Sequence, residues 1–332
     1  MSLMRLSCTK CLFDPSSPNF AFAFLKLKRE RIEIEEKPLA AGGFGAVHKA
    51  TLIRADGVTE CIAVKVFHHR SSRLEEKAAF KLVADVPTFI KYIGDYDPLV
   101  QAYDVSPEVF KQKEFILIQL AEGGDLFRVN AHLYFLSERL HGDAARAYTK
   151  QVLVNVGRLH EHKIAHRDIK VENFLVQLIP GEPASLLLAD AGLVTSEVFS
   201  DDCKVGNAHI SAPEMRRNGW HDLTKADVWS ALLMAAMAVL GNFNLSTAGR
   251  FGLQNDYVRG YVLRISLNDP PDLRAAKEFF SRVLVVDPEH RQSAEELLHD
   301  PYFFGLEDDV DLGPIFDDLD KRYRQYGGLP FS

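Results

Sequence analysis

The chain has 332 residues, of which 47% are hydrophobic and 26% are charged, and its formal net charge is −7. This composition is typical of a globular protein, and the length exceeds that of one ordinary single-core domain. The negative charge favours cationic partners over nucleic acid, and no apolar run approaches the roughly 20 residues of a membrane-spanning helix.

Four cysteines are too few and too scattered for a disulfide framework. Cys8 and Cys11 form a lone C-x-x-C, and without a second pair a zinc site is not favoured. The first residues lack an uninterrupted apolar core, so they do not indicate a secretory signal. We therefore expect a reducing, cytoplasmic location, with the nucleus as an alternative.

The first half of the chain favours β-structure with one helix. Glycines cluster in one turn, alternating apolar residues mark strands, and one segment has helical spacing. The expected elements are the glycine-rich turn Leu39–Val47, the strand Ile62–Lys65, the helix Ser72–Val83, two candidate strands Phe89–Ile93 and Leu99–Val105, the strand Phe115–Ala121 and the link Glu122–Leu126.

The second half is predicted to be mostly helical. One of its helices is apolar nearly all round, which is typical of a helix buried in a large lobe. The last 28 residues, 305–332, are rich in acidic side chains and are interpreted as a solvated or docking tail. The expected helices are Ala144–His160, the apolar helix Ala226–Leu240, Leu273–Leu284 and Ser293–Leu298.

His166–Asn173 places an acid, a lysine and an amide at fixed offsets in one short loop. This set suits phosphoryl transfer. Asp168 would orient and deprotonate a hydroxyl group, Lys170 would neutralise the moving phosphoryl group, and Asn173 would hold a metal ion. The stretch resembles the catalytic loop of eukaryotic protein kinases, and its lysine is the choice of the serine/threonine type.

Other segments resemble further parts of this family, in the same order. Leu39–Val47 is similar to the glycine-rich loop, in which Gly42 and Gly45 would let the backbone approach phosphates. Ile62–Lys65 is similar to the strand whose lysine, here Lys65, contacts the α- and β-phosphates.

After the catalytic loop, Asp190 stands where the family's Asp-Phe-Gly segment has its metal-binding aspartate. Ser211–Glu214 matches the Ala-Pro-Glu segment, and Arg291 matches the arginine that pairs with its glutamate. In the family this pair builds a platform for peptide docking.

The resemblance implies a two-lobed α+β fold that binds ATP with Mg²⁺, or alternatively Mn²⁺, between its lobes. The implied domain runs over 31–304, with the small lobe at about 31–120, the hinge at about 119–125 and the large lobe at about 126–304, after an extension at 1–30. The implied nucleotide-contacting residues are Leu39, Gly42, Gly45, Val47, Ala63, Lys65, Ile118, Gln119, Ala121, Asp125 and Leu175.

The glutamate that should pair with Lys65 is the least determined residue. Glu75 and Glu76 lie on the predicted helix, and Glu76 is preferred because Phe80 follows it on the same face. Asp85 remains an alternative, as does a solvent-facing position for both glutamates.

Two substitutions depart from the family pattern. Ala40 replaces the first glycine of the loop, and Ala191 replaces the phenylalanine that packs against the helix bearing the glutamate. A side chain such as Phe80 or Tyr92 would fill the vacated space, or a cavity would remain. These departures keep open a pseudokinase that acts as a nucleotide-binding scaffold. A small-molecule kinase of related fold is the third hypothesis.

Regulation and substrate choice can also be predicted from the resemblance. In the family, a phosphorylated residue on the activation segment, here Asp190–Glu214, neutralises the arginine that precedes the catalytic aspartate, here Arg167. Cys203 stands nearest the usual phosphorylation site, so Asp201 or Asp202 would pair with Arg167 instead, unless Ser200 or Thr195 is phosphorylated.

The expected partner is a protein substrate with basic residues near the acceptor, because Glu172 and Asp125 lie where related kinases read such residues. Asn207 stands where serine/threonine kinases usually have a threonine, which leaves the choice between serine and threonine open. Oligomeric state is open as well.

Overall fold

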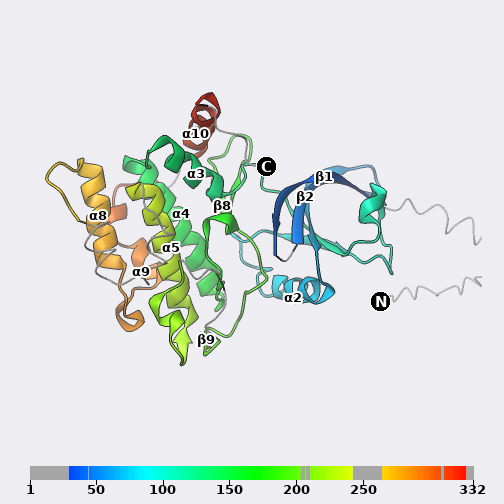
Figure 1. Cartoon of the computed structure of the whole chain (residues 1–332), viewed down its shortest axis with the longest axis horizontal. Coiled ribbons are helices and arrows are strands. Elements are labelled where there is room, and N and C mark those ends of the chain that lie inside the picture. Colours follow the sequence, from blue (N-terminus) through cyan, green and yellow to red (C-terminus); the bar gives the residue numbers. More distant parts are fainter. Residues whose placement is uncertain are drawn as a thin grey trace, which may run out of the picture.

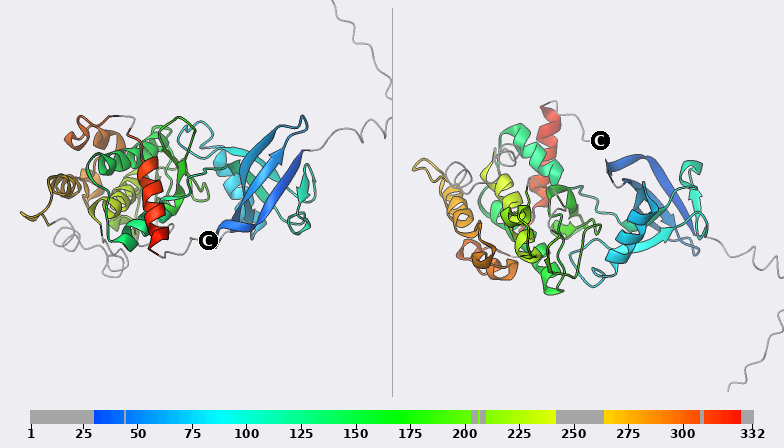
Figure 2. Two further views of the ribbon diagram at one scale, coloured as in Figure 1. Left: turned by 90° about the horizontal axis from the view of Figure 1, so that it is seen from above. Right: turned by 60° about the horizontal axis from the view of Figure 1, so that its bottom comes forward.

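The computed structural model describes residues 30–43, 45–202, 206, 210–241, 264–307 and 310–326. A small lobe built on a β-sheet lies beside a larger, mostly helical lobe (Figures 1 and 2). The predicted two-lobed α+β fold is therefore confirmed. The predicted extension at 1–30, apart from its last residue, lies outside the described residues.

Among the described residues, six strands form the sheet of the small lobe, in the order β4-β6-β3-β2-β1-β5. In β3, Ile62 and Val64 lie in the outer hydrophobic cluster of this lobe, whereas Ala63 lies in the cluster shared with the large lobe. Lys65 is the next residue on the face of Ala63. The strands are β1 (Arg31–Gly42), β2 (Gly45–Ile53), β3 (Thr59–Phe67), β4 (Tyr92–Tyr96), β5 (Asp104–Ser106) and β6 (Phe115–Gln119).

Helix α2 (Arg70–Phe80) is held to this sheet by an ionic network. Arg73 is 2% exposed, and its guanidinium donates to Glu114 at 2.7 Å, Asp95 at 2.8 Å and Asp97 at 3.4 Å. A buried charge is stable only with such partners. The network therefore fixes the rotation of α2 about its own axis.

The strands predicted at Phe89–Ile93 and Leu99–Val105 were placed wrongly. The observed strands begin later, at Tyr92 and Asp104, and Phe89 lies in the loop between α2 and β4. The apolar residues of this loop are buried against the large lobe instead of continuing a sheet.

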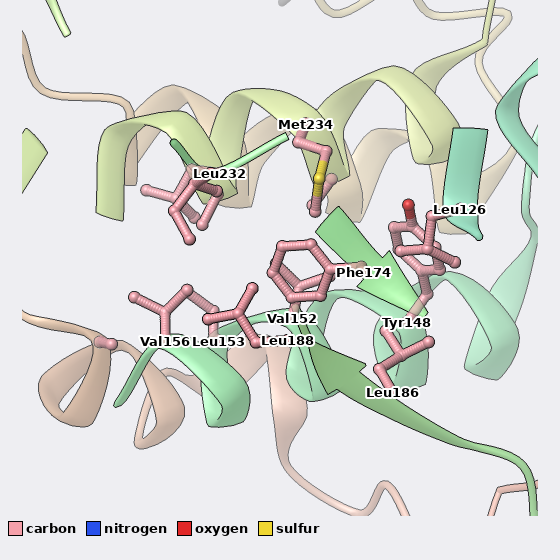
Figure 3. Packing of buried hydrophobic residues seen from close by; sticks show 14 of the residues in the cluster. Leu126, Tyr148, Val152, Leu153, Val156, Phe174, Leu186, Leu188, Leu232 and Met234 are labelled. Atoms are coloured by element: carbon pink, nitrogen blue, oxygen red, sulfur yellow. The ribbon is translucent and has the colours of Figure 1, made fainter. Parts of the chain in front are cut away.

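The large lobe packs its helices around a single hydrophobic core. Figure 3 shows Leu232 and Met234 of α5 facing Val152 and Val156 of α4, with Phe174 among them. Burial of this kind contributes about 1.5–3 kcal/mol per large side chain. The helices are α3 (Leu126–Leu136), α4 (Gly142–Glu161), α5 (Leu223–Leu240), α8 (Pro271–Val283), α9 (Ala294–Leu298) and α10 (Gly313–Gln325), and the short strands are β7 (Phe174–Gln177), β8 (Ser185–Leu188), β9 (Phe199–Ser200) and β10 (His221–Asp222).

Helix α5 is the most buried helix of this lobe. Its start is capped by Asp222, whose carboxylate accepts from the backbone N–H groups of Thr224 and Lys225. In length and composition α5 could cross a membrane, but 78% of its apolar window is buried inside the described structure, as in the core helix of a folded domain.

The interpretation of residues 305–332 as a solvated acidic tail was wrong for α10. This helix packs on α3 (Figure 1), and Phe316, Leu319 and Tyr323 on its inner face are buried. The ring of Tyr323 stacks on the imidazole of His132 at 4.2 Å between centroids. The apolar stripe of α10 was obscured by the acidic residues between its members.

Arg291 and Glu214 form a deeply buried ion pair in the large lobe. The side chain of Arg291 has no exposed surface, and its two terminal nitrogens donate to the Glu214 carboxylate at 2.6 and 3.0 Å. The guanidinium also lies over the ring of Trp229, 5.0 Å from the centroid. The pair predicted from the sequence is therefore formed.

Removing one partner should leave the other as an uncompensated buried charge. We predict that Arg291→Met lowers the free energy of unfolding by about 3–5 kcal/mol, and that adding Glu214→Met recovers part of this loss. Arg158→Met, which breaks the exposed pair with Glu161, is the matched control and should cost no more than about 1 kcal/mol. Equal losses in chemical denaturation of the two arginine variants would contradict the prediction.

Candidate active site

Three elements bring one ammonium and two carboxylates together. Lys65 of β3 donates from Nζ to Oε1 and Oε2 of Glu76 in α2, at 2.8 and 2.6 Å. The same Nζ donates to Oδ1 of Asp190, just after β8, at 3.0 Å. The residue preferred from the sequence is thus the one in contact, whereas Glu75 and Asp85 are exposed.

The local structure explains why Lys65, Glu76 and Asp190 are in contact. Alternation along β3 turns Lys65 toward the shared cluster and α2. The Arg73 network presents the face of α2 that carries Glu76, which is 3% exposed. Asp190 has a φ of +66°, a left-handed conformation that is uncommon for aspartate and turns the chain sharply after β8.

The electrostatics follow from one cation shared by two carboxyl groups in a buried place. Burial opposes the charged form of Lys65, but Glu76 and Asp190 outweigh it and raise its pKa. Burial raises the pKa of Glu76 to about 7, with the charge of Asp190 adding to this and Lys65 opposing it. Burial also works against ionised Asp190, yet Lys65 lowers the pKa of that carboxyl.

The predicted catalytic loop is held by hydrogen bonds from α5. The backbone N–H groups of His166 and Arg167 donate to Oδ2 and Oδ1 of Asp227, at 2.7 and 2.9 Å. His166 Nε2 lies 3.0 Å from the carbonyl oxygen of Ala189, so the loop is also tied to the residue before Asp190. Sequence reasoning missed this role of Asp227, although a buried aspartate in an apolar helix is a usable signal.

Within the loop, Asp168 is the centre of the polar contacts. Lys170 Nζ donates to its Oδ2 at 2.6 Å. Asn173 Nδ2 donates to its carbonyl oxygen at 2.8 Å and to Oδ2 at 3.2 Å. The three predicted residues of the loop therefore lie together, with one carboxylate oxygen, Oδ1, outside these bonds.

Asp168, Asp190 and Glu76 also line one small hollow of about 40 Å³. Among the described residues no group of three or more histidines, cysteines and acids could hold a metal ion by itself. Mg²⁺ in phosphoryl-transfer sites needs fewer protein ligands, because substrate phosphates and water complete its shell. A carboxylate, as in Asp190, and an amide oxygen, as in Asn173, are ligand types that a divalent cation accepts.

Several of the predicted nucleotide-contacting residues are neighbours in the sheets of the two lobes. Strand pairing sets Val47 beside Lys65 and Ala63 beside Ile118. Leu175 of β7 bridges to Asp125. Leu39 is 49% exposed and lies outside the shared core cluster. The residues that belong to this cluster or pack against it are Ala63, Ile118, Val47, Ala121 and Leu175.

The glycine-rich turn and the hinge carry the remaining predicted residues. A Cβ on Gly45 would come within 2.0 Å of the Val66 carbonyl oxygen, so only glycine fits against β3, whereas a Cβ on Gly42 would meet nothing within 4 Å. Gln119 ends β6, and its backbone N–H donates to the carbonyl oxygen of Lys91. Asp125 accepts from the backbone N–H of Arg128 and caps α3.

The activation segment supplies an acidic partner for Arg167. Arg167 Nη2 donates to Oδ2 of Asp202 at 2.6 Å and to its carbonyl oxygen at 3.1 Å. A Cβ on Gly206 would come within 2.3 Å of the Arg167 carbonyl oxygen, so this glycine permits the close approach. Cys203 and Asn207 lie outside the described residues.

Comparisons with known proteins agree with this geometry. The family profile described as "Protein kinase domain" matches residues 34–303. The chain is 26% identical over 249 residues to CBL-interacting serine/threonine-protein kinase 5 of Arabidopsis thaliana, which covers 73% of this chain and 52% of that protein. It is 32% identical over 206 residues to serine/threonine-protein kinase H1 of Mus musculus, covering 60% of this chain and 47% of that protein. The chain thus spans about half the length of these relatives.

The shared cation makes a prediction about proton binding. In the folded chain burial raises the pKa of Glu76 to about 7, above the 4.5 of a free glutamate carboxyl. Between these values the folded state binds more protons, so the contribution of Glu76 to stability falls as pH rises. Wild type should therefore lose more unfolding free energy between about pH 5 and about pH 8 than Glu76→Gln does.

Chemical denaturation of both proteins at the two pH values measures this difference. The pH dependence contributed by titrating groups elsewhere in the chain is common to both proteins and cancels in the comparison. A wild type that gains stability with pH relative to Glu76→Gln would mean that Lys65 dominates and that the pKa of Glu76 is lowered.

Proposed function

The chain belongs to the protein kinase family, and on that premise we propose that it transfers the γ-phosphoryl group of ATP to serine or threonine hydroxyl groups of proteins. The observation that carries the proposal is the contact of Lys65 Nζ with both Glu76 and Asp190, beside a hollow that Asp168 also lines. The serine/threonine type rests on Lys170 and on the names of the relatives.

Each of four residues has a separate role in the proposed reaction. Asp168 orients the acceptor hydroxyl and takes its proton on the carboxylate, and Lys170, 2.6 Å away, neutralises the charge that develops on the phosphoryl oxygens. Lys65 binds the α- and β-phosphates, and Glu76 keeps its ammonium in position.

When bound, a divalent metal ion would be held by Asn173 and Asp190 and would offset the phosphate charge. We propose Mg²⁺, with Mn²⁺ as the alternative, because both accept carboxylate and amide oxygens.

The proposed substrate has basic residues near the acceptor. Glu172 is exposed and lines a hollow of about 390 Å³ together with Glu138 and Lys170. Asp125 is weaker support, because its carboxylate caps α3 and lies beside the positive charge of Arg128. Glu172 is therefore the main basis for this preference.

A nucleotide-binding scaffold without activity is the second hypothesis, and Ala191 is the observation that favours it. Both hypotheses need Lys65, but only the enzyme needs Asp168.

We predict that Lys65→Met and Asp168→Ala each lower kcat/KM by at least about 100-fold with labelled ATP and a peptide array, while both variants remain folded. Lys81→Met and Asp85→Ala change exposed residues of the same types and should retain activity.

Peptides with arginine or lysine before the acceptor should be the best substrates.

Each result separates the hypotheses. Nucleotide binding without transfer in wild type would support the scaffold. Substantial turnover by Asp168→Ala would refute the assignment of the catalytic base, and a preference for acidic peptides would refute the role of Glu172.

The Arg167–Asp202 contact supports activity without phosphorylation of the activation segment. Asp202 is exposed whereas Arg167 is mostly buried, and the pair occupies the arginine that a phosphate would otherwise neutralise. We predict that phosphatase treatment leaves the activity of wild type unchanged, and that Asp202→Asn lowers kcat several-fold while Asp201→Asn does not.

Mass spectrometry before and after the phosphatase step completes this test. If activity collapses and phosphate is lost from Ser200 or Thr195, phosphorylation performs the role assigned to Asp202.

A further inference from the structure

Ala191 carries a methyl group where the family has a phenylalanine ring, and it shares one buried cluster with Phe80 and Phe89, against which Tyr92 packs. Ala191 is completely buried. The rings of Tyr92 and Phe80 lie 5.6 Å apart between centroids, and those of Phe80 and Phe89 lie 6.1 Å apart at an interplanar angle of 82°. The ring of Phe89 then lies 6.0 Å from the imidazole of His166.

These spacings fall in the range of roughly 4.5–7 Å in which aromatic pairs attract one another beyond simple area burial. The four side chains therefore form an unbroken row, hereafter the aromatic row, from strand β4 to the catalytic loop. Phe80 ends the helix that carries Glu76, and His166 begins the loop that carries Asp168.

Phe89 occupies the position in this row where the two lobes meet. It is 1% exposed, and its segment is fixed to strand β8 by two backbone hydrogen bonds. Ile90 N–H donates to the Leu188 carbonyl oxygen at 2.8 Å, and Leu188 N–H donates to the Thr88 carbonyl oxygen at 2.8 Å. The ring is thus anchored to the strand that leads directly into Asp190.

We propose that Phe89 is a positioning residue that replaces the missing ring at residue 191 and keeps Glu76 and Asp168 in register. The proposal rests on the proposed kinase function for its main readout. A positioning role of Phe89 can be distinguished from ordinary core packing. If Phe89 has this role, a ring supplied from residue 191 should substitute for its ring.

The experiment compares wild type, Phe89→Ala, Ala191→Phe and the double variant, with Phe89→Leu held in reserve if Phe89→Ala does not fold. Phe110→Ala is the matched control. Phe110 is a buried ring of the same lobe, but it packs on His48 in the outer cluster and lies outside the aromatic row.

Loss of Phe89 should lower kcat by about 10- to 100-fold, because small displacements of reacting groups have effects of this size. Ala191→Phe should restore at least half of this loss on a logarithmic scale in the double variant. In wild type, where the space is filled, the same change should lower the melting temperature through overpacking. Phe110→Ala should lower the melting temperature while kcat stays within about twofold of wild type.

Three results would overturn the inference: a normal kcat for Phe89→Ala, a double variant no better than Phe89→Ala, or an equal loss of kcat in Phe110→Ala. A wild type without kinase activity would refute the proposed function and leave melting temperature as the readout. The double variant must then melt above both single variants, and additive destabilisation would overturn the proposal.

Discussion

One ammonium group shared by two carboxylates is the interaction on which the rest of this structure depends. Lys65, Glu76 and Asp190 come from a strand, a helix and a loop that are distant in the sequence and belong to both lobes. A lysine this deeply buried is charged only if its partners are close. The contact therefore requires α2 to lie against β3 and the end of β8 to approach both, which brings the lobes into one arrangement.

Other buried charges hold the parts that make this contact possible. Arg73 fixes α2 on the sheet through three carboxylates, and Asp227 fixes the catalytic loop through two backbone N–H groups. Each of these groups would be costly to bury alone, so each specifies one relative placement of two elements. The active arrangement is thus built from contacts within the chain, with Asp202 of the activation segment completing the loop at Arg167.

The local motifs were predictable because their chemistry depends on residues that are close in sequence. Asp168, Lys170 and Asn173 share one loop, and the preference for Glu76 followed from its helical spacing to Phe80. Phe89, Asp227 and α10 were not recognised, because their roles depend on packing against elements far along the chain. The β-branched and aromatic residues around Phe89 favour a strand. In the structure Phe89 instead lies in a loop that is buried against the large lobe.

The central claim is that this preassembled site performs metal-dependent phosphoryl transfer. Its most direct test is the time course of labelled phosphate transfer from ATP to a basic acceptor peptide by wild type and by Asp190→Asn, with Mg²⁺ present and after chelation. The account predicts transfer by wild type that stops on chelation, and no transfer above background by Asp190→Asn. Equal transfer by the two proteins, or transfer that continues without a divalent ion, would contradict it.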